Sequence, residues 1–283
     1  TSSYRGRACN AAGCTAYSTV SNVEVRYPPR SAPTLSVPAT NNSGTFAVSW
    51  TAVSSADRYE LQQRKDAGSW SRVYNASGLS TAVANLTDGT HDFRARACNE
   101  HGCSGYSAIK NTQVTHPPST APTLTAPSTS NSGAFTVTWT GVSSASRYEL
   151  QQRMDGGSWS RIHNAASTSR AVADLTNGTY NYRVRACNAG GCATFSTIRT
   201  TVVTRPPTGA PTLTAPESNN TGSFTLSWTS VPGATTYYVW QRKDGSGLDP
   251  WKNIYSGANR STSLSALGNG RYEHYVRACN AGG

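Results

Sequence analysis

The sequence predicts an all-β protein built from several similar β-sandwich domains in a row. Three observations support this: a motif returns at a nearly fixed interval, apolar residues alternate with a period of two, and paired prolines mark regular joints. The motif, R-A-C-N-x-x-G-C, begins at Arg7, Arg96 and Arg185, and its first seven residues return at Arg277. An interval of about 90 residues suits a small domain and is too long for a solenoid unit.

The joints read Pro-Pro-x-x-Ala-Pro-Thr-Leu and begin at Pro28, Pro117 and Pro206. Because consecutive prolines favour the extended polyproline II conformation, we expect semi-rigid connections. We also expect a cysteine to follow Gly283 in the parent protein and to complete the fourth motif. The joints predict four parts: the last two strands of one domain (1–27), two complete domains (28–116 and 117–205), and a domain without its last strand (206–283).

Within a repeat, apolar and polar residues alternate. Phe46, Val48 and Trp50 are separated by small residues, and Tyr180 and Tyr182 begin a second alternating run. This period is typical of half-buried strands, and clusters of Asn, Asp and Gly separate the runs. We find no sustained helical period. About seven short strands in each repeat predict a β-sandwich.

Particular residues of the repeat resemble the fibronectin type III domain. The family pattern has a Trp in the second strand, a Tyr opening the third, Leu-x-x-Gly-Thr before the sixth, and Asn-x-x-Gly after it. The matching positions are Trp139, Tyr148, Leu175, Gly178-Thr179, Arg183–Ala186, Asn188 and Gly191. The resemblance implies tandem seven-stranded, immunoglobulin-like sandwiches and is nearly silent on function.

One departure concerns the tyrosine that ties the corner before the sixth strand in this family. It matches Tyr180 and Tyr272, but the second repeat has His91 instead. We expect His91 to hold the corner less well, which would make the second domain softer.

The cysteines fall into three C-x4-C pairs. In the family pattern the first cysteine ends the sixth strand and the second begins the seventh, so the two face each other across a hairpin. This implies the disulfides Cys9–Cys14, Cys98–Cys103 and Cys187–Cys192, with Cys279 left over. Free thiols and a metal site are the alternatives, the latter disfavoured because no third ligand repeats. We expect no metal or cofactor, and persistent disulfides indicate secretion.

The formal net charge is +11, mostly from arginine. Strand alternation places Glu60, Gln62 and Arg64 on an outward face, opposite Arg94 and Arg96. One interpretation is a solvated face with cross-strand ion pairs. The other is a basic stripe that attracts an anionic polymer such as acidic polysaccharide, lipopolysaccharide or extracellular DNA. No motif supports base-specific nucleic-acid recognition, and no run of residues is apolar enough to span a membrane.

The last repeat carries aromatic residues where the others have polar ones. Tyr238, Trp240 and Tyr275 replace Glu, Gln and Arg, beside Arg277, which makes these four residues the candidate binding site. Packing, a partner or self-assembly interface, and glycan binding are the alternatives. A second recurring set, which we expect to cover the sandwich edge, comprises Trp70, Trp159 and Trp251.

No catalytic constellation recurs, so we expect a protein that is not an enzyme. The combination of bracketed hairpins, arginine-rich strands and Pro-Pro joints resembles tandem fibronectin type III arrays of large secreted or surface bacterial proteins. It predicts a rigid extracellular spacer, or the body of a surface fibre or adhesin, with copies of itself or a cell-surface glycan as partner. The alternative is an accessory glycan-binding array attached to an extracellular enzyme or toxin.

Overall fold

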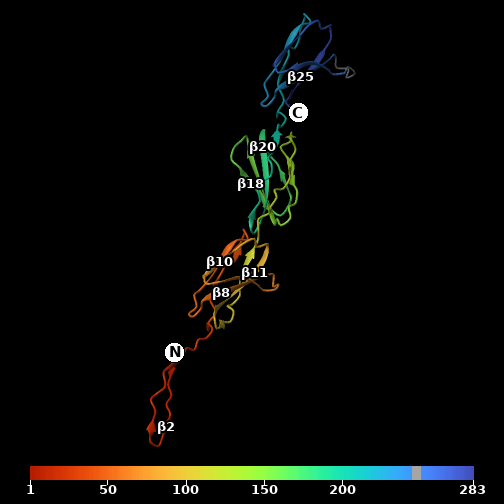
Figure 1. The fold of residues 1–283 in the computed structure, drawn as a ribbon. Coiled ribbons are helices and arrows are strands. Elements are labelled where there is room, and N and C mark those ends of the chain that lie inside the picture. The colour runs from red at the N-terminus through yellow and green to blue at the C-terminus, as the bar shows by residue number, and fades with distance from the viewer. Residues whose placement is uncertain (244–249) are drawn as a thin grey trace. The chain divides into compact units, whose positions relative to one another are not determined.

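The computed structural model describes residues 1–243 and 250–283. These residues form strands connected by turns and loops (Figure 1), and within them no helix is long and apolar enough to cross a bilayer. The chain divides into two compact units, which are considered separately below. One comprises Thr1–Pro117 with Ala189–Gly191, and the other Pro118–Asn188 with Cys192–Gly283. The finer division expected from the joints stays a prediction.

The first unit begins with an exposed hairpin, which we call the first segment. Its outer strands pair antiparallel and its inner strands form the turn (Figure 1). The strands are β1 (Ser2–Tyr4), β2 (Cys9–Asn10), β3 (Gly13–Cys14) and β4 (Ser21–Val23).

The second module, β5 to β13, is a sandwich of two sheets with strand orders β10-β7-β5 and β6-β13-β11-β8-β9, β12 pairing with β11. Its long strands β8 and β11 pair antiparallel. The strands are β5 (Leu35–Ser36), β6 (Thr40–Asn41), β7 (Phe46–Trp50), β8 (Arg58–Lys65), β9 (Ser71–Ala76), β10 (Ser80–Val83), β11 (Gly89–Asn99), β12 (Gly102–Cys103) and β13 (Lys110–Val114).

The third module, β14 to β22, repeats this order as β14-β16-β19 and β15-β22-β20-β17-β18, with β21 on β20. Its strands are β14 (Leu124–Thr125), β15 (Thr129–Ser130), β16 (Phe135–Trp139), β17 (Arg147–Met154), β18 (Ser160–Ala165), β19 (Ser169–Val172), β20 (Gly178–Asn188), β21 (Gly191–Cys192) and β22 (Arg199–Val203).

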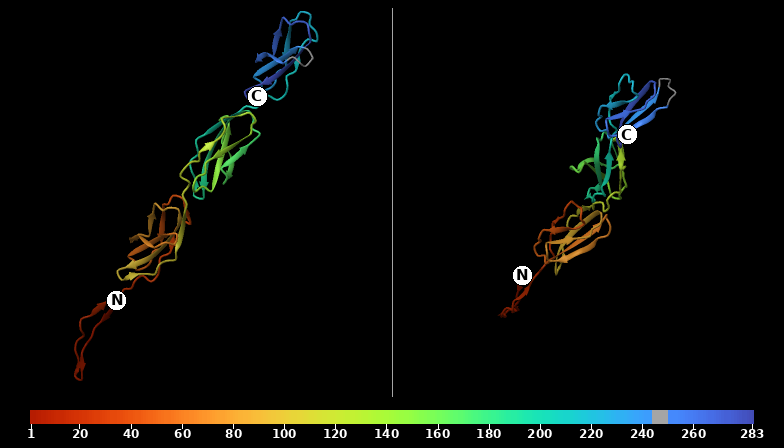
Figure 2. Two further views of the ribbon diagram at one scale, coloured as in Figure 1. Left: turned by 90° about the vertical axis from the view of Figure 1, so that its right-hand side faces the viewer. Right: turned by 90° about the horizontal axis from the view of Figure 1, so that it is seen from above.

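The fourth module, β23 to β28, contains the sheets β23-β24-β27 and β26-β25-β28. Its strands are β23 (Leu213–Thr214), β24 (Phe224–Trp228), β25 (Thr236–Lys243), β26 (Lys252–Gly257), β27 (Ser261–Leu264) and β28 (Tyr272–Cys279). The residues between Lys243 and Pro250, where we expect a longer loop, lie outside the described ones. Figure 2 shows the sheets of each module from two further sides.

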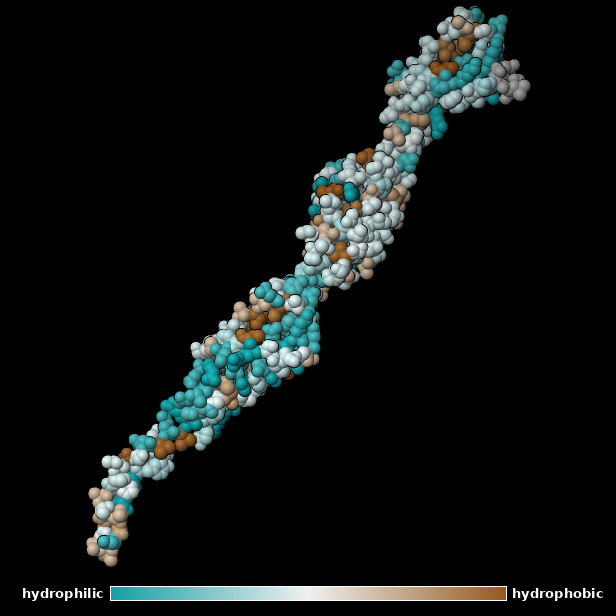
Figure 3. All heavy atoms as spheres, turned by 45° about the vertical axis from the view of Figure 1, so that its right-hand side comes forward, coloured by the Kyte–Doolittle hydropathy of each residue, from teal (hydrophilic) through white to brown (hydrophobic). Residues whose placement is uncertain are grey.

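The predicted alternation is confirmed by the burial of the inward residues. Val48 and Trp50 of β7 and Leu61 of β8 are buried between the sheets, and Tyr182 and Val184 occupy the same layer in the third module. The prediction of an all-β chain of tandem β-sandwiches is therefore confirmed. On the face shown in Figure 3, apolar side chains reach the surface only in small separated patches.

The prediction for His91 is wrong in its premise. The His91 ring is buried, and Nε2 lies 2.9 Å from the Thr87 carbonyl oxygen, four residues earlier. Tyr180 makes the same connection through its hydroxyl, which donates to the Thr176 carbonyl at 3.1 Å. Because a carbonyl only accepts, Nε2 carries the proton and Nδ1 accepts from Gln63 at 3.0 Å. His91 therefore ties the corner as tyrosine does.

Candidate functional site

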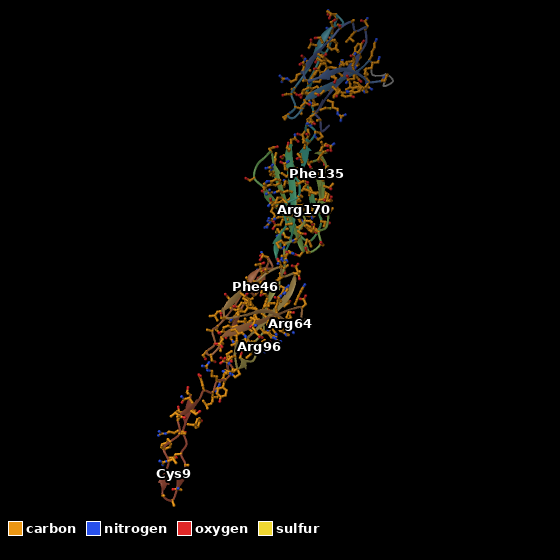
Figure 4. The ribbon with its side chains drawn as sticks, in the orientation of Figure 1. Cys9, Phe46, Arg64, Arg96, Phe135 and Arg170 are labelled. Carbon is orange, nitrogen blue, oxygen red and sulfur yellow. A yellow bond between two sulfur atoms is a disulfide. The ribbon has the colours of Figure 1, made fainter. Side chains whose placement is uncertain are left out.

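The three expected disulfides are present. They join Cys9 to Cys14, Cys98 to Cys103, and Cys187 to Cys192, while Cys279 is free. In the first two pairs the cysteines lie directly opposite each other in the register, Cys9 with Cys14 and Cys98 with Cys103. Figure 4 labels Cys9 in the hairpin of the first segment. Each disulfide closes a short turn, and this turn carries the asparagine of the repeated motif.

That asparagine holds the chain that enters the module. In the second module, Nδ2 of Asn99 donates to the Tyr27 carbonyl at 2.9 Å and to the Ser55 carbonyl at 3.1 Å. Its Oδ1 accepts from the His101 amide at 2.9 Å. Asn99 is buried, so its amide connects the joint, an adjacent loop and the turn away from solvent. We call this arrangement the joint clamp.

The fourth module has the same joint clamp. Nδ2 of Asn280 donates to the carbonyls of Arg205 at 2.8 Å and Gly233 at 3.0 Å. Its Oδ1 accepts from the Gly282 amide at 2.8 Å. Tyr27 and Arg205 are both the residue before the first proline of a joint, where the backbone is restricted to extended conformations. In both modules the clamp asparagine therefore donates to the carbonyl oxygen of the residue that precedes the first proline of the joint.

The preceding module holds the same residue from its other side. The Arg205 amide donates to Oδ1 of Asn177 in the third module at 2.7 Å. In the second module, Asp88 does the same for His116, accepting from its amide at 2.8 Å and from Nδ1 at 2.6 Å. These bonds to His116 hold the pKa of Asp88 below its usual range. Both backbone polar groups of Arg205 are thus hydrogen-bonded, one by each neighbouring module.

The last glycine of the motif fits this geometry. Gly102 has a φ of 136°, in the region that favours glycine, and an added Cβ would lie 3.1 Å from Cγ of Pro28. The equivalent glycine of the fourth module, Gly283, has a φ of 140°, and an added Cβ would lie 3.2 Å from Cγ of Pro206. The residue before it, Gly282, is tighter still, since its Cβ would lie 1.8 Å from the Thr204 carbonyl oxygen. Small residues here let the turn pack directly against the joint.

The outward face of the larger sheet in the second module carries alternating arginines and aromatic rings, which we call the ladder. The Arg94 guanidinium lies between the rings of Trp70 and Tyr106, with its carbon 4.2 and 4.1 Å from their centroids. Arg64 stacks on the far side of Trp70 at 4.6 Å, and Arg96 lies beside Tyr106 at 4.9 Å. Figure 4 labels Arg64 and Arg96 on this sheet and Phe46 on the other.

Carboxylates close both ends of this ladder. Asp92 accepts from Nε of Arg64 at 2.8 Å, and Glu60 accepts from Arg96 at 2.7 Å. The expected Glu–Arg pairs are therefore present, and the carboxylate of Glu60 is buried beneath them, with the residue only 5% exposed. Rings that cover charged pairs lower the local dielectric and strengthen them.

The recurring tryptophans have a different role from the expected one. Rather than covering the sandwich edge, Trp70 lies against arginines of the outward face. In the third module, the Trp159 ring lies between the guanidinium carbons of Arg153 and Arg183, which are 4.7 and 4.2 Å from its centroid. One partner of each tryptophan, Arg64 or Arg153, lies six residues before it, and the other, Arg94 or Arg183, lies 24 residues after it on another strand. Apart from the recurrence of Trp, no sequence signal predicted this second contact.

The third module repeats the ladder with one change of charge. Phe195 takes the place of Tyr106 and lies 4.2 Å from the Arg183 guanidinium. Glu149 accepts from Arg185 at 2.7 Å, as Glu60 does from Arg96. At the other end, where the second module has Asp92, the third has Asn181. Burial and the two neighbouring arginines, Arg153 and Arg185, lower the pKa of Arg183.

The four candidate binding residues of the fourth module lie on adjacent strands. Tyr238 pairs with Arg277 and Trp240 with Tyr275 in the register of β25 and β28. The rings of Trp240 and Tyr275 are nearly parallel, 12° apart, with centroids separated by 6.2 Å. Trp251 meets Tyr275 edge-on at 4.6 Å, and Tyr275 is 41% exposed. The aromatic cluster therefore forms as the register predicts, while its binding role stays a prediction.

A possible metal-ligand group was missed by the sequence analysis. The Glu60 carboxylate and the sulfurs of Cys98 and Cys103 lie within 4.8 Å of one another, and Glu149 repeats this in the third module. Each pair of cysteines therefore has a third potential metal ligand nearby, the buried carboxylate of Glu60 or Glu149. Metal coordination by cysteine needs the thiolate, and here both sulfurs are held in a disulfide.

Comparisons with known proteins do not assign a function to the chain. No protein-family model matches the chain, and no curated protein matches it. Among solved structures, the chain is similar to the crystal structure of the FN1-FN3 domains of chicken CNTN1. The identity is 21% and the TM-score 0.32, over 90% of this chain and 94% of that one. Function must therefore be inferred from the residues themselves.

Proposed function

We propose that the protein is a non-catalytic extracellular array that acts as a rigid spacer or as the repeating body of a surface fibre. One observation carries this proposal: the joint residue Arg205 is hydrogen-bonded through its amide to Asn177 and through its carbonyl to Asn280. A connection held by both neighbours resists swivelling. The parallel bonds of Tyr27 and His116 argue that the device is repeated.

Each hydrogen bond stabilises a clamped joint by only about 1 kcal/mol. The clamps act together with the joint prolines, which restrict the backbone before any clamp forms. The disulfide adds to this, because it limits the conformations of the turn that carries the clamping asparagine. Disulfides of this kind persist in oxidising compartments, which supports an extracellular location.

Several of the described polar groups that could perform chemistry have structural partners instead. Glu60 and Glu149 pair with arginines, and both nitrogens of His91 are hydrogen-bonded within the second module. Asp88 and His116 bind each other at the joint. This use of ionisable residues favours a mechanical role over a catalytic one.

Small-angle X-ray scattering of the chain tests the proposal. We expect the profile of an extended particle, and we expect Asn280→Asp and Asn99→Asp to increase flexibility, because a carboxylate cannot donate to the joint carbonyl. Asn10→Asp is the matched control, since the Asn10 side chain only accepts within its own turn. A compact wild-type profile, or clamp variants that behave like the control, would contradict the spacer. Electron microscopy of the native assembly then separates a continuous fibre from isolated threads.

Glycan binding by the fourth module is a second candidate, favoured by the Trp240–Tyr275 pair and the exposure of Tyr275. Aromatic rings beside the exposed Arg277 suit a sugar that stacks and hydrogen-bonds. A glycan array compares the wild type with the double variant Tyr238→Ala, Trp240→Ala. Binding lost in the double variant would support this candidate. An array with no wild-type signal would leave the rings as packing.

A further inference from the structure

We infer that the third module binds the carboxylate of an acidic polysaccharide at the Arg153 end of its ladder. The inference is independent of the spacer function. It starts from a comparison within the chain: three arginines of the second-module ladder have two carboxylates, Asp92 and Glu60, as ion-pair partners. The three arginines of the third-module ladder share only Glu149, which lies at the far end.

The difference comes from a single position. Asp92, Asn181 and Glu273 occupy equivalent places beside Arg64, Arg153 and Arg242 of their modules. Glu273 binds Arg242 and Asp92 binds Arg64 through a carboxylate. Asn181 offers Arg153 only a neutral amide oxygen, 3.1 Å from Nε. Among the second, third and fourth modules, only the third lacks a carboxylate beside the arginine at this position.

No carboxylate of the described residues pairs with Arg153 or Arg183. The nearest acid along the chain, Asp155, accepts from the Thr179 amide at 2.7 Å. Glu149 is engaged by Arg185 at 2.7 Å and by Arg161 at 3.6 Å. Positive charge therefore accumulates at one end of the ladder, in agreement with the lowered pKa of Arg183.

The guanidinium groups at this end are already positioned. The Trp159 ring lies between Arg153 and Arg183, and Nε of Arg183 donates to Gln151 at 2.8 Å. The terminal nitrogens of Arg153 have no hydrogen-bond partner among the residues that the structure describes. A stacked guanidinium loses little conformational freedom on binding and matches the two oxygens of a carboxylate.

The second module indicates which anion fits. There the same place, beside the same Arg–Trp–Arg stack, is filled by the Asp92 carboxylate. A carboxylate on an extended polymer could reach Arg153 on this outward strand face. The faces of the Trp159 ring are covered by Arg153 and Arg183, so its half-exposed edge is the surface that the attached sugar would contact. A polyuronate meets both requirements.

The test is isothermal titration with oligogalacturonate, with NMR chemical shifts to locate the site. We expect resonances of Arg153 and Trp159 to shift, binding to weaken with salt, and Asn181→Asp to reduce affinity about tenfold by supplying an internal carboxylate. The converse variant, Asp92→Asn, should create a second site in the second module. Both exchanges copy a residue found at the equivalent position, and circular dichroism checks that they fold.

Arg153→Gln is a second variant that removes the cation without adding an acid, and it should abolish the shifts at Trp159. Unchanged affinity in Asn181→Asp would overturn the inference, as would shifts confined to the fourth module. Dextran is the neutral control. Equal binding of dextran sulfate or duplex DNA would mean that any polyanion suffices, which would overturn the assignment of a carboxylate ligand.

Discussion

At the residue scale, one core position shows what the modules tolerate. Phe93, Tyr182 and His274 are equivalent, and each meets a phenylalanine of the opposite sheet edge-on. The Tyr182 hydroxyl and Nε2 of His274 are buried without a hydrogen-bond partner among the described residues. Burial raises the pKa of Tyr182 and lowers that of His274, because each charged form would lose its hydration.

Tyr182→Phe should therefore stabilise the third module by about 1 kcal/mol, since it removes an unpaired buried hydroxyl and leaves the ring in place. Phe93 shows that the position accepts this ring. Denaturant unfolding measures the change. The reverse exchange, Phe93→Tyr, is the matched control and should destabilise the second module. A stability loss in Tyr182→Phe would indicate a hidden partner for the hydroxyl.

The same hydroxyl predicts a pH dependence in alkali. Tyrosine in the unfolded chain ionises near pH 10, and the folded pKa of Tyr182 is raised above this. Ionisation of this group leaves the stability of the third module unchanged below about pH 10 and lowers it as the pH rises further, because only the unfolded state then releases the proton. Unfolding of the third module from pH 8 to 11 should show this loss in the wild type. Tyr182→Phe should show a smaller one.

At the element scale, the hairpin that carries the repeated motif combines several functions. Its arginine closes the ladder, its alanine lies in the core, its cysteines form the disulfide, and its asparagine clamps the joint. The motif could be recognised from the sequence, and its disulfide followed from family spacing. The clamp could not, because the partners of Asn99 are backbone carbonyls of residues that carry no sequence signal.

The ladder was only partly predictable, for a similar reason. Alternation places Arg94 and Gln62 on one face, and they do bond, at 2.7 Å. The aromatic residues that cover them, Trp70 and Tyr106, lie outside the regular strands and reach over the sheet. Period-two patterns give the face of a strand residue and say nothing about what neighbouring loops place on it.

Removing the disulfide tests how far the hairpin depends on it. The double variant Cys98→Ser, Cys103→Ser should destabilise the second module by about 2 kcal/mol, the value for closing so short a loop. Thermal unfolding in the absence of reductant measures this. Cys9→Ser with Cys14→Ser alters the hairpin of the first segment instead, so it should leave unfolding of the second module unchanged. A similar loss in both variants would argue against a local effect.

At the scale of the whole molecule, prolines and clamps make separate contributions to the joints. Replacing Pro206 and Pro207 by glycine should shorten the maximum dimension in scattering, because the joint then samples bent conformations. Adding Asn280→Asp should shorten it further, since that change removes the hydrogen bond to the Arg205 carbonyl and leaves only the Asn177 bond to its amide. Ser31→Gly, within the first joint, is the control for a glycine that replaces no proline. An unchanged dimension in the combined variant would mean that other contacts fix the joint.

The turn glycine at the third joint bears on how such an array can be lengthened by gene duplication. An added Cβ at Gly282 would lie 1.8 Å from the Thr204 carbonyl oxygen, whereas the second module carries His101 at the equivalent position. A copy of the second module inserted after Thr204 would bring its imidazole against that carbonyl. The third joint as built therefore suits a glycine at this position and not a histidine, so the second module is not a direct replacement for the fourth.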